Sequence, residues 1–447
     1  MSAIDDPSSL LATLLDKAKK AGADAADAIF VNGISLSTSY RLGKPEDLER
    51  SEGHDLGLRV LLGQQQAMVS TTDFAEDALD ELVSRAIAMA GAVPEDPFCG
   101  LIEPSQLARD WPDLELADTG EPGPEKLIEW ARRAEEAARA VPGVTNSEGG
   151  DASWGRSHKA LATSGGFSGS YKSSSFSFSV SVLAGEDTGM ERDYDWSSAC
   201  FEDDLGEPEE IGRNAGEGAV RRLNPRKAPS GPVPVVYDPR VSGGLIRHLS
   251  GAISGASVAR GTSFLKDRLG QAVFAPGLNV TDDPHRKRGM RSRPFDGEGA
   301  ATTRREIIKD GVLTTWLLDS RSARQLGLST TGHAARGTGG PPTPSPSNLY
   351  LEPGLASPKE LMADIESGLY VTELIGMGVN GVTGDYSRGA AGFWIDKGEI
   401  AWPVSELTVA GNLKDMFAHI TPANDLTFRY GVDAPTLRVD GMTVAGQ

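Results

Sequence analysis

The chain has 447 residues, of which 63 are acidic and 44 basic, so its net charge is −19. This length suits two domains, and hydrophobic and charged fractions of 39% and 24% exclude a fibrous or disordered chain. The negative charge argues against nucleic-acid binding, and the lack of a run of about 20 apolar residues argues against a membrane span.

Periodic segments of helix and strand type alternate through the first half. Apolar residues recur at helical spacing over residues 10–18, 74–90 (with Asp73 as the N-cap), 127–141 and 208–223. Strand-like runs cover residues 28–40 and 56–70, the second with a turn at Gly63 and Gln64. Residues 175–182 alternate serine with an apolar residue, which predicts a half-buried antiparallel strand. We expect its serines to form a solvated face rather than a binding surface.

The second half reads mostly as strands and turns. A strand over residues 233–237 precedes a helix over 241–253, and short apolar runs follow at 306–308, 313–318, 369–374 and 392–395. Residues 337–348 (GTGGPPTPSPSN) are expected to form a loop that cannot pair as a strand. This pattern predicts a β-rich barrel or sandwich with one or two helices.

The charge distribution places the domain boundary. Residues 1–228 hold 41 acidic and 22 basic side chains, whereas residues 229–447 hold 22 of each. The change falls at a proline-rich stretch, residues 226–234 (RKAPSGPVP), which is typical of a linker. We therefore predict an α+β protein: an acidic α/β domain with antiparallel strands over residues 1–228, and a β-rich domain over residues 229–447.

Short generic motifs identify no catalytic site. Residues 376–381 fit G-x-G-x-x-G, but a turn-rich segment follows instead of the helix that a dinucleotide site needs. The two nearest histidines, His248 and His285, are too far apart for a helix-borne zinc pair. A basic cluster at residues 286–293 is expected to be a solvated loop; the alternative is a positive rim that attracts an acidic peptide or the carboxylate end of a substrate.

Five longer segments form a distinctive set: residues 383–395 (TGDYSRGAAGFWI), 403–416 (PVSELTVAGNLKDM), 304–311 (RREIIKDG), 329–334 (STTGHA) and 190–194 (MERDY). Together they resemble the TldE (PmbA) branch of the TldD/PmbA metallopeptidase family. The resemblance implies an α/β N-terminal domain, a β-rich C-terminal domain and a cytosolic peptidase built from two homologous subunits. In the TldD-type subunit, an H-E-x-x-x-H helix and a cysteine hold zinc, and the glutamate acts as the general base.

This sequence departs from that pattern at the metal positions. His248 stands where the first zinc ligand would be, but Leu249 replaces the glutamate and Ile253 the second histidine. Ala390 occupies the position of the cysteine. The resemblance therefore implies a chain with no catalytic residue and no zinc of its own, and zinc in its partner subunit.

The leading hypothesis is a non-catalytic subunit that supports a TldD-like catalytic subunit in the proteolysis of unfolded or small peptides. It would form a heterodimer with that subunit, or a homodimer when alone, and it would bind neither nucleic acid nor membrane. The candidates for a remnant, peptide-binding cleft are His248, His333, Asp385, Tyr386, Ser387 and Arg388. Two alternatives stay open: an autonomous hydrolase with an unrecognised nucleophile or metal site, and a purely regulatory binding protein.

A cytoplasmic location is expected. The two cysteines, Cys99 and Cys200, lie far apart, which suits a reducing compartment better than a disulfide framework. Residues 1–6 lack a basic region followed by an apolar core, so they do not predict a secretory leader.

Overall fold

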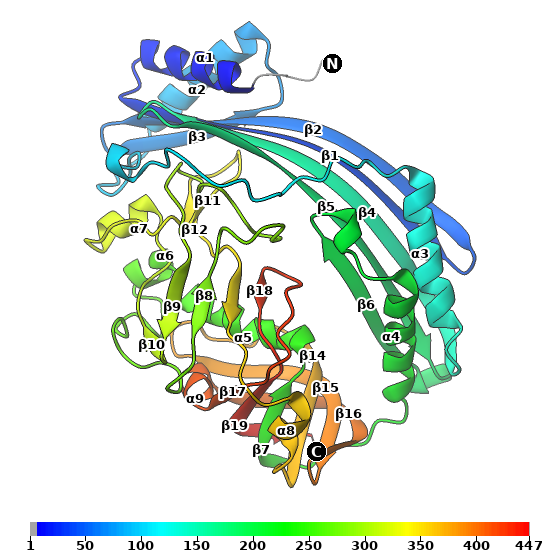
Figure 1. Cartoon of the computed structure of the whole chain (residues 1–447). Helices are drawn as coiled ribbons and strands as arrows, with labels where there is room; N and C mark the ends of the chain where they lie inside the picture. The colour runs from blue at the N-terminus through cyan, green and yellow to red at the C-terminus, as the bar shows by residue number, and fades with distance from the viewer. Residues whose placement is uncertain (1–6, 447) are drawn as a thin grey trace.

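A long, curved antiparallel sheet arches over a β-rich C-terminal region in the computed structural model, which describes residues 7–446 (Figure 1). The predicted α+β class is confirmed. Residues 1–6, on which the expectation about a leader rests, lie outside the described range. No helix within residues 7–446 is both long and apolar enough to cross a membrane.

The N-terminal sheet has six strands in the order β3-β2-β1-β4-β5-β6, all paired antiparallel. Their bounds are β1 (Ala25–Arg41), β2 (Lys44–Leu62), β3 (Gln65–Thr71), β4 (Val144–Thr163), β5 (Ser168–Ala184) and β6 (Glu191–Ala199). The predicted turn at Gly63 is present between β2 and β3, and Gly63 adopts the positive φ that the turn needs.

Two pairs of helices cover this sheet. The helices α1 (Pro7–Lys20) and α2 (Glu76–Ala90) pack their leucines over one end of β1, β2 and β3. The helices α3 (Pro124–Arg139) and α4 (Pro208–Arg221) cover the apolar side of β5, where Phe176, Phe178, Val180 and Val182 are buried. One detail differs from the sequence prediction: Ala75, rather than Asp73, precedes α2, and the Asp73 carboxylate instead accepts a hydrogen bond from the Ala75 amide.

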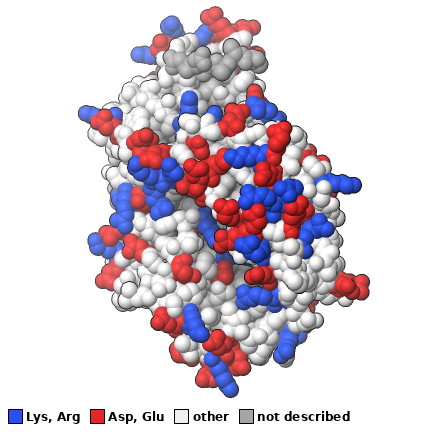
Figure 2. All heavy atoms as spheres, turned by 45° about the vertical axis from the view of Figure 1, so that its right-hand side comes forward, with Lys and Arg blue, Asp and Glu red and all other residues white. Residues whose placement is uncertain are grey.

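The surface over α3 and α4 carries interleaved charges of both signs (Figure 2). Several of them are paired, as in the ion pair Arg133–Glu209 between α3 and α4 (2.7 Å) and the pair Arg132–Glu136 within α3 (2.7 Å). The acidic excess of the first half is therefore locally balanced by arginines on this face.

The C-terminal region is built around a closed barrel of five strands. Its order is β16-β15-β14-β7-β19, and β19 pairs back onto β16. The bounds are β7 (Gly231–Tyr237), β14 (Ser367–Ile375), β15 (Asp385–Asp396), β16 (Glu399–Asn412) and β19 (Leu437–Ala445), with β17 (Ile420–Pro422) added beside β19. Only β7 and β14 pair in parallel; the other neighbours are antiparallel. Closure leaves no free edge among the five strands.

A second sheet and several short helices surround the barrel. The sheet runs β10-β9-β8-β13-β18, with bounds β8 (Val280–Asp282), β9 (Arg305–Lys309), β10 (Val312–Leu313), β13 (Leu349–Leu351) and β18 (Val432–Asp433). The helices are α5 (Pro239–Ala252), α6 (Gly255–Ala259), α7 (Ser320–Gln325), α8 (Pro358–Met362) and α9 (Leu413–Ala418).

The proline-rich segment 337–348 differs from the prediction that it cannot pair. Two of its residues form β12 (Thr343–Pro344), which pairs antiparallel with β11 (Ala334–Ala335). Pro344 has no backbone N–H to donate, but this ladder has only two residue pairs. The amide of the next residue, Ser345, donates a hydrogen bond to the His333 carbonyl (2.8 Å).

The serines over residues 175–182 of β5 are partly or fully exposed, in line with the predicted solvated face. The apolar side chains of β5 pack on α3 and α4, so the serines project from the opposite face of the sheet. There Ser179 and Ser181 line a cavity together with residues of α5 and β15, and Ser173 and Ser175 line another with the segment 289–297. The serines thus face the C-terminal region.

Buried ion pairs join the two regions. Asp27 of β1 is buried and binds both Arg59 of β2 and Arg336, which follows β11. Burial opposes ionisation of Asp27, but Arg336 and Arg59 hold its pKa below the ordinary value. A second contact links Arg240 of α5 to Asp193 of β6 (2.5 Å).

Candidate functional site

The helix α5 presents one apolar face and one polar face. It begins at Pro239, after Asp238, whose carboxylate accepts a hydrogen bond from the Arg240 amide (2.9 Å). Leu245, Ile246 and Leu249 are buried in the C-terminal core. Helical spacing then turns Arg247, His248 and Gly251 toward a cavity on the other side of the helix.

The strand β15 supplies the facing side chains. Tyr386 is buried, and its ring meets the His248 ring edge to face, with centroids 6.0 Å apart and an interplanar angle of 78°. Arg388 lies two residues further along the strand and on the same side, as the period of two requires. Its Nη2 donates to the Leu374 carbonyl (3.4 Å), whereas its buried Nε has no acceptor within the described residues.

Two cavities meet at Arg247 and Arg388. The inner one, of about 310 Å³, is lined by His248, Phe264, Met377 and Val379 as well as the two arginines. The outer one, of about 440 Å³, lies between α5 and the N-terminal sheet, where Arg192, Tyr194 and Ser181 line it. A molecule between the sheet and α5 would therefore contact both arginines.

The electrostatics of the inner cavity are cationic. Burial, and then the charges of Arg388 and Arg247, lower the pKa of His248, so its imidazole is neutral at neutral pH. Burial raises the pKa of Tyr386, which stays protonated. None of the residues that line this cavity is acidic. The site therefore suits electron-rich groups such as peptide carbonyls and carboxylates.

The other predicted site residues lie apart from this group. Asp385 and Ser387 alternate with Tyr386 and Arg388 on β15 and are exposed on the other side of the strand. The Asp385 carboxylate accepts hydrogen bonds from Thr383 (2.6 Å) and from Asn412 (3.1 Å), which lower its pKa. This carboxylate caps the turn before β15 and does not line the cavity.

His333 is held in a buried network elsewhere. Its Nδ1 lies 2.8 Å from the Thr331 hydroxyl and its Nε2 lies 3.2 Å from the Asp282 carboxylate. Asp282 is also bonded to the amide of Ser347 (2.8 Å). The contacts of His333 join β8 to the segments around it, and His333 does not line the cavities beside α5.

The residues at the family's zinc positions do not fit a zinc ion. Leu249 and Ile253 are buried in the hydrophobic core, and Ala390 is buried on β15. His248 is thus the one metal-binding side chain among these positions, and Arg247 and Arg388 beside it would repel a dication. No group of three or more His, Cys, Asp or Glu residues within residues 7–446 is arranged to hold a metal.

Sequence reasoning missed part of this site. Arg247, Phe264 and Met377 line the inner cavity, and Arg247 also borders the outer one, yet none was a candidate. Arg247 adjoins His248, so the helical period alone could have placed it near the cavity mouth. Phe264 and Met377 come from loops, and no local pattern indicates where such loops fold.

Comparison with known proteins identifies this scaffold. Profiles of the PmbA/TldA metallopeptidases match in three consecutive segments: domain 1 at residues 26–90, the central domain at 117–223 and the C-terminal domain at 230–446. The metalloprotease PmbA of Escherichia coli O157:H7 is 41% identical over 435 residues, which covers 97% of this chain and 94% of that protein. The PmbA homolog of Haemophilus influenzae is 38% identical over 436 residues, with the same coverage.

Solved structures agree. A crystal structure of a protein from Bacteroides thetaiotaomicron matches with a TM-score of 0.91 and 28% identity, covering 99% of both chains. TldE from Thermococcus kodakarensis has the same fold, with a TM-score of 0.88 at 19% identity over 98% of this chain and 100% of that chain. The scaffold is thus that of a metallopeptidase family. The chain belongs to the PmbA/TldD metallopeptidase family, in its PmbA (TldE) branch, and the resemblance seen in the sequence is confirmed.

Proposed function

We propose that this chain is the zinc-free subunit of a two-subunit metallopeptidase, and that it completes the peptide-binding cavity of a TldD-like catalytic subunit. One observation carries the proposal. The family profiles match residues 26–90, 117–223 and 230–446, whereas the zinc positions hold Leu249, Ile253 and Ala390, which are hydrocarbon side chains in a packed core. The metal that the family implies would then belong to the partner.

An apolar patch beside the cleft supports docking of a partner. Ile375 at the end of β14 and Met377 and Val382 on the loop that follows are exposed, and Met377 is 90% exposed. Met377 also lines the inner cavity. Exposed apolar side chains that border a cleft are typical of interaction sites, and a homologous subunit would place an equivalent surface opposite them.

The outer cavity supports a role in holding peptide. The sheet ends at β6, an edge strand, and Arg192 and Tyr194 of β6 line this cavity. The amides of Tyr194 and Trp196 donate to the Asp193 and Asp195 carboxylates (2.8 and 2.9 Å), so a peptide that pairs with this edge would have to displace these two local bonds. An extended peptide can add to such an edge through backbone hydrogen bonds. Arg247 and Arg388, on the opposite wall, would then bind peptide carbonyls or carboxylates.

Mixing this chain with a purified TldD-like subunit tests the proposal. We expect co-elution at micromolar concentration and the onset of chelator-sensitive cleavage of an unfolded peptide such as denatured casein. Met377→Asp should weaken both, because it puts a charge in the apolar patch. Leu355→Asp is the matched control, since Leu355 is equally exposed but lies between β13 and α8.

The proposal is wrong if the two chains never co-elute and cleavage is the same with and without this chain. Chelator-sensitive cleavage by this chain alone would favour an autonomous hydrolase instead.

A further inference from the structure

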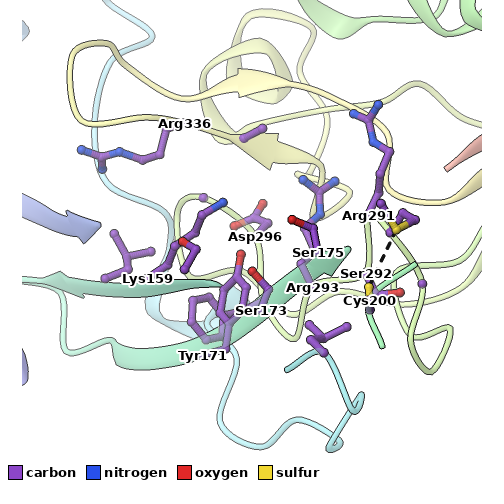
Figure 3. A pocket seen from close by; sticks show the side chains of 18 of the residues that line it. Lys159, Tyr171, Ser173, Ser175, Cys200, Arg291, Ser292, Arg293, Asp296 and Arg336 are labelled. Atoms are coloured by element: carbon purple, nitrogen blue, oxygen red, sulfur yellow. Dashed lines mark hydrogen bonds between the residues drawn. The ribbon is translucent and has the colours of Figure 1, made fainter. Parts of the chain in front are cut away.

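A third cavity, of about 450 Å³, lies on the serine-bearing face of the N-terminal sheet, away from α5. Figure 3 shows Lys159 of β4 and Tyr171, Ser173 and Ser175 of β5 projecting from the strands toward the segment that carries Arg293 and Asp296. The site described above shares none of these residues.

Three of the cations that line this cavity make no ion pair within residues 7–446. Two of its five basic side chains are committed elsewhere: Arg336 pairs with Asp27, and Arg156 donates to the carbonyls of residues 118–120. Lys159, Arg291 and Arg293 have no ion-pair partner anywhere in residues 7–446. Arg291 and Arg293 donate only to hydroxyl and carbonyl oxygens of the segments beside them.

The basic cluster of residues 286–293 is thereby divided. Arg286 lies over the Phe428 ring, with its Cζ 3.3 Å from the centroid, and Arg288 pairs with Asp204 (3.1 Å). Lys287 pairs with Glu115 on the exposed surface. Of the five basic residues in this cluster, only Arg291 and Arg293 line the cavity. Lys287 and Arg288 form ion pairs at the surface, whereas Arg291 and Arg293 form none.

The one carboxylate in the lining is bound by backbone amides. Oxygen Oδ1 of Asp296 accepts hydrogen bonds from the amides of Glu298 and Ala300 (2.8 Å each), and Oδ2 accepts one from the amide of Ala334 (3.0 Å). The Nε of Arg293, in contrast, is buried and has no acceptor in the described structure. Burial and the charge of Arg293 lower the pKa of Lys159, as expected where two cations lie close together.

We propose that this cavity binds a carboxylate group of a peptide, either its C-terminal carboxylate or an acidic side chain. Lys159 and Arg293 would bind the two oxygens, and the hydroxyls of Tyr171, Ser173 and Ser175 would donate to the same group. The inference rests on the proposed function only in taking a peptide as the ligand. The serine face of β5 continues from this cavity to the one beside Arg388, which gives an extended chain a polar path between them.

Peptide binding to the isolated full-length chain tests this inference. The probes are three hexapeptides of alanine and serine with an uncharged N-terminal fluorophore: one with a free C-terminal carboxylate, its C-terminal amide, and the amide with one internal glutamate. By fluorescence anisotropy we expect at least one carboxylate peptide to bind about tenfold or more tighter than the plain amide. The peptide that binds more tightly shows whether the cavity prefers a C-terminal carboxylate or an acidic side chain. The preference should weaken as salt increases.

Lys159→Met should abolish the preference. Lys172→Met is the matched control, because Lys172 is an exposed lysine on β5 outside the cavity, and it should leave the preference unchanged. Arg293→Met is a second variant, to be compared only if its thermal unfolding matches that of the parent chain. Equal binding of all three peptides, no binding of any, or a preference that survives Lys159→Met would overturn the inference. This binding experiment needs no partner subunit, so failure of the activation experiment would not affect the inference about the cavity. Failure of the binding experiment would likewise leave the proposed function untouched.

Discussion

At the scale of single residues, the cleft beside α5 is defined by arginines rather than by metal ligands. Arg388 borders both cavities, and the Leu374 carbonyl accepts only one of its guanidinium N–H groups, so its terminal nitrogens have donors left for a bound peptide. Its planar guanidinium can bind a carboxylate or two carbonyls in a bidentate manner, which a lysine ammonium cannot do.

Replacing Arg388 should therefore impair peptide handling by the complex. We expect Arg388→Ala to raise KM for an unfolded peptide by roughly tenfold, equivalent to about 1.4 kcal/mol, with little change in kcat because the residue binds but does not react. Arg388→Lys should recover only part of the loss. The exposed Lys414→Ala serves as the control. Unchanged kinetics in Arg388→Ala would assign this arginine to packing alone.

A second residue-scale feature is the buried Glu298. It accepts a hydrogen bond from the Ser320 amide at the start of α7 (2.8 Å), and burial together with neighbouring Asp296 raises its pKa to about 7. In the unfolded chain the same carboxyl has its ordinary pKa of about 4.5. Since the folded state keeps this proton to a higher pH than the unfolded state does, Glu298 should lower the free energy of unfolding progressively as the pH rises from about 4.5 to about 7.

Glu298→Gln should remove this contribution. The free energy of unfolding in urea, measured from pH 4.5 to 8, should fall less steeply in the variant than in the parent, with a difference of about 3 kcal/mol by pH 8. Parallel pH profiles of parent and variant would show that Glu298 does not titrate in this range.

At the scale of elements, the contact between α3 and α4 depends on glycine. A Cβ on Gly212 of α4 would lie 2.2 Å from the Ala134 carbonyl oxygen, and one on Gly216, a helical turn later, 2.7 Å from the Ala138 carbonyl oxygen. Both carbonyls belong to the α3 backbone, which cannot yield as a flexible side chain would.

We expect Gly212→Ala to destabilise the chain by about 2 kcal/mol, because α4 must move away from α3 and from the sheet beneath. Gly244→Ala is the matched control: Gly244 is also a helical glycine, but a Cβ there meets no atom within 4 Å. That variant should be neutral, or more stable by up to about 1 kcal/mol. Chemical denaturation of both variants decides the comparison, and equal effects would exclude a steric cause.

Which elements the sequence predicts depends on how they are buried. The helices α1, α3 and α4 and the strand β5 each have one apolar face, and periodicity located them well. The first part of β2, residues 44–53, was missed because every residue there is exposed, so no apolar alternation marks it as a strand. The serine alternation of β5 was recognised, but local sequence does not say that a second domain would lie over the polar face.

At the scale of the whole molecule, the main consequence of the site concerns metal. His248 lacks the ligands that would share the dehydration cost of a divalent ion, and two arginines flank it. We expect the isolated, chelator-free chain to contain much less than one zinc per chain by elemental analysis. His248→Ala is the control variant, and about one zinc per chain that is lost in this variant would contradict the expectation.

The arrangement of distant segments could not be predicted from local patterns. The cleft joins His248 on α5 to Tyr386 and Arg388 on β15, and the cationic cavity joins Lys159 to Arg293. Residues this far apart meet only because the barrel and the curved sheet hold them, and the family resemblance anticipated the fold class but not the cationic cavity. The same holds for the buried ion pairs that join the two regions, because nothing in the local sequence indicates that Asp27, Arg59 and Arg336 would meet.

Closure of the barrel also orders events during synthesis of the chain. The N-terminal sheet uses strands from residues 25–199, all of which emerge from the ribosome before β7 begins at Gly231. The barrel, in contrast, needs β19, which begins at Leu437 and pairs with both β7 and β16. The first domain can therefore fold while translation continues, whereas β7 and β16 keep unpaired edges until the last strand is released. Throughout that interval the nascent C-terminal region exposes strands that could pair with other chains, so this is the stage at which a chaperone would be needed most.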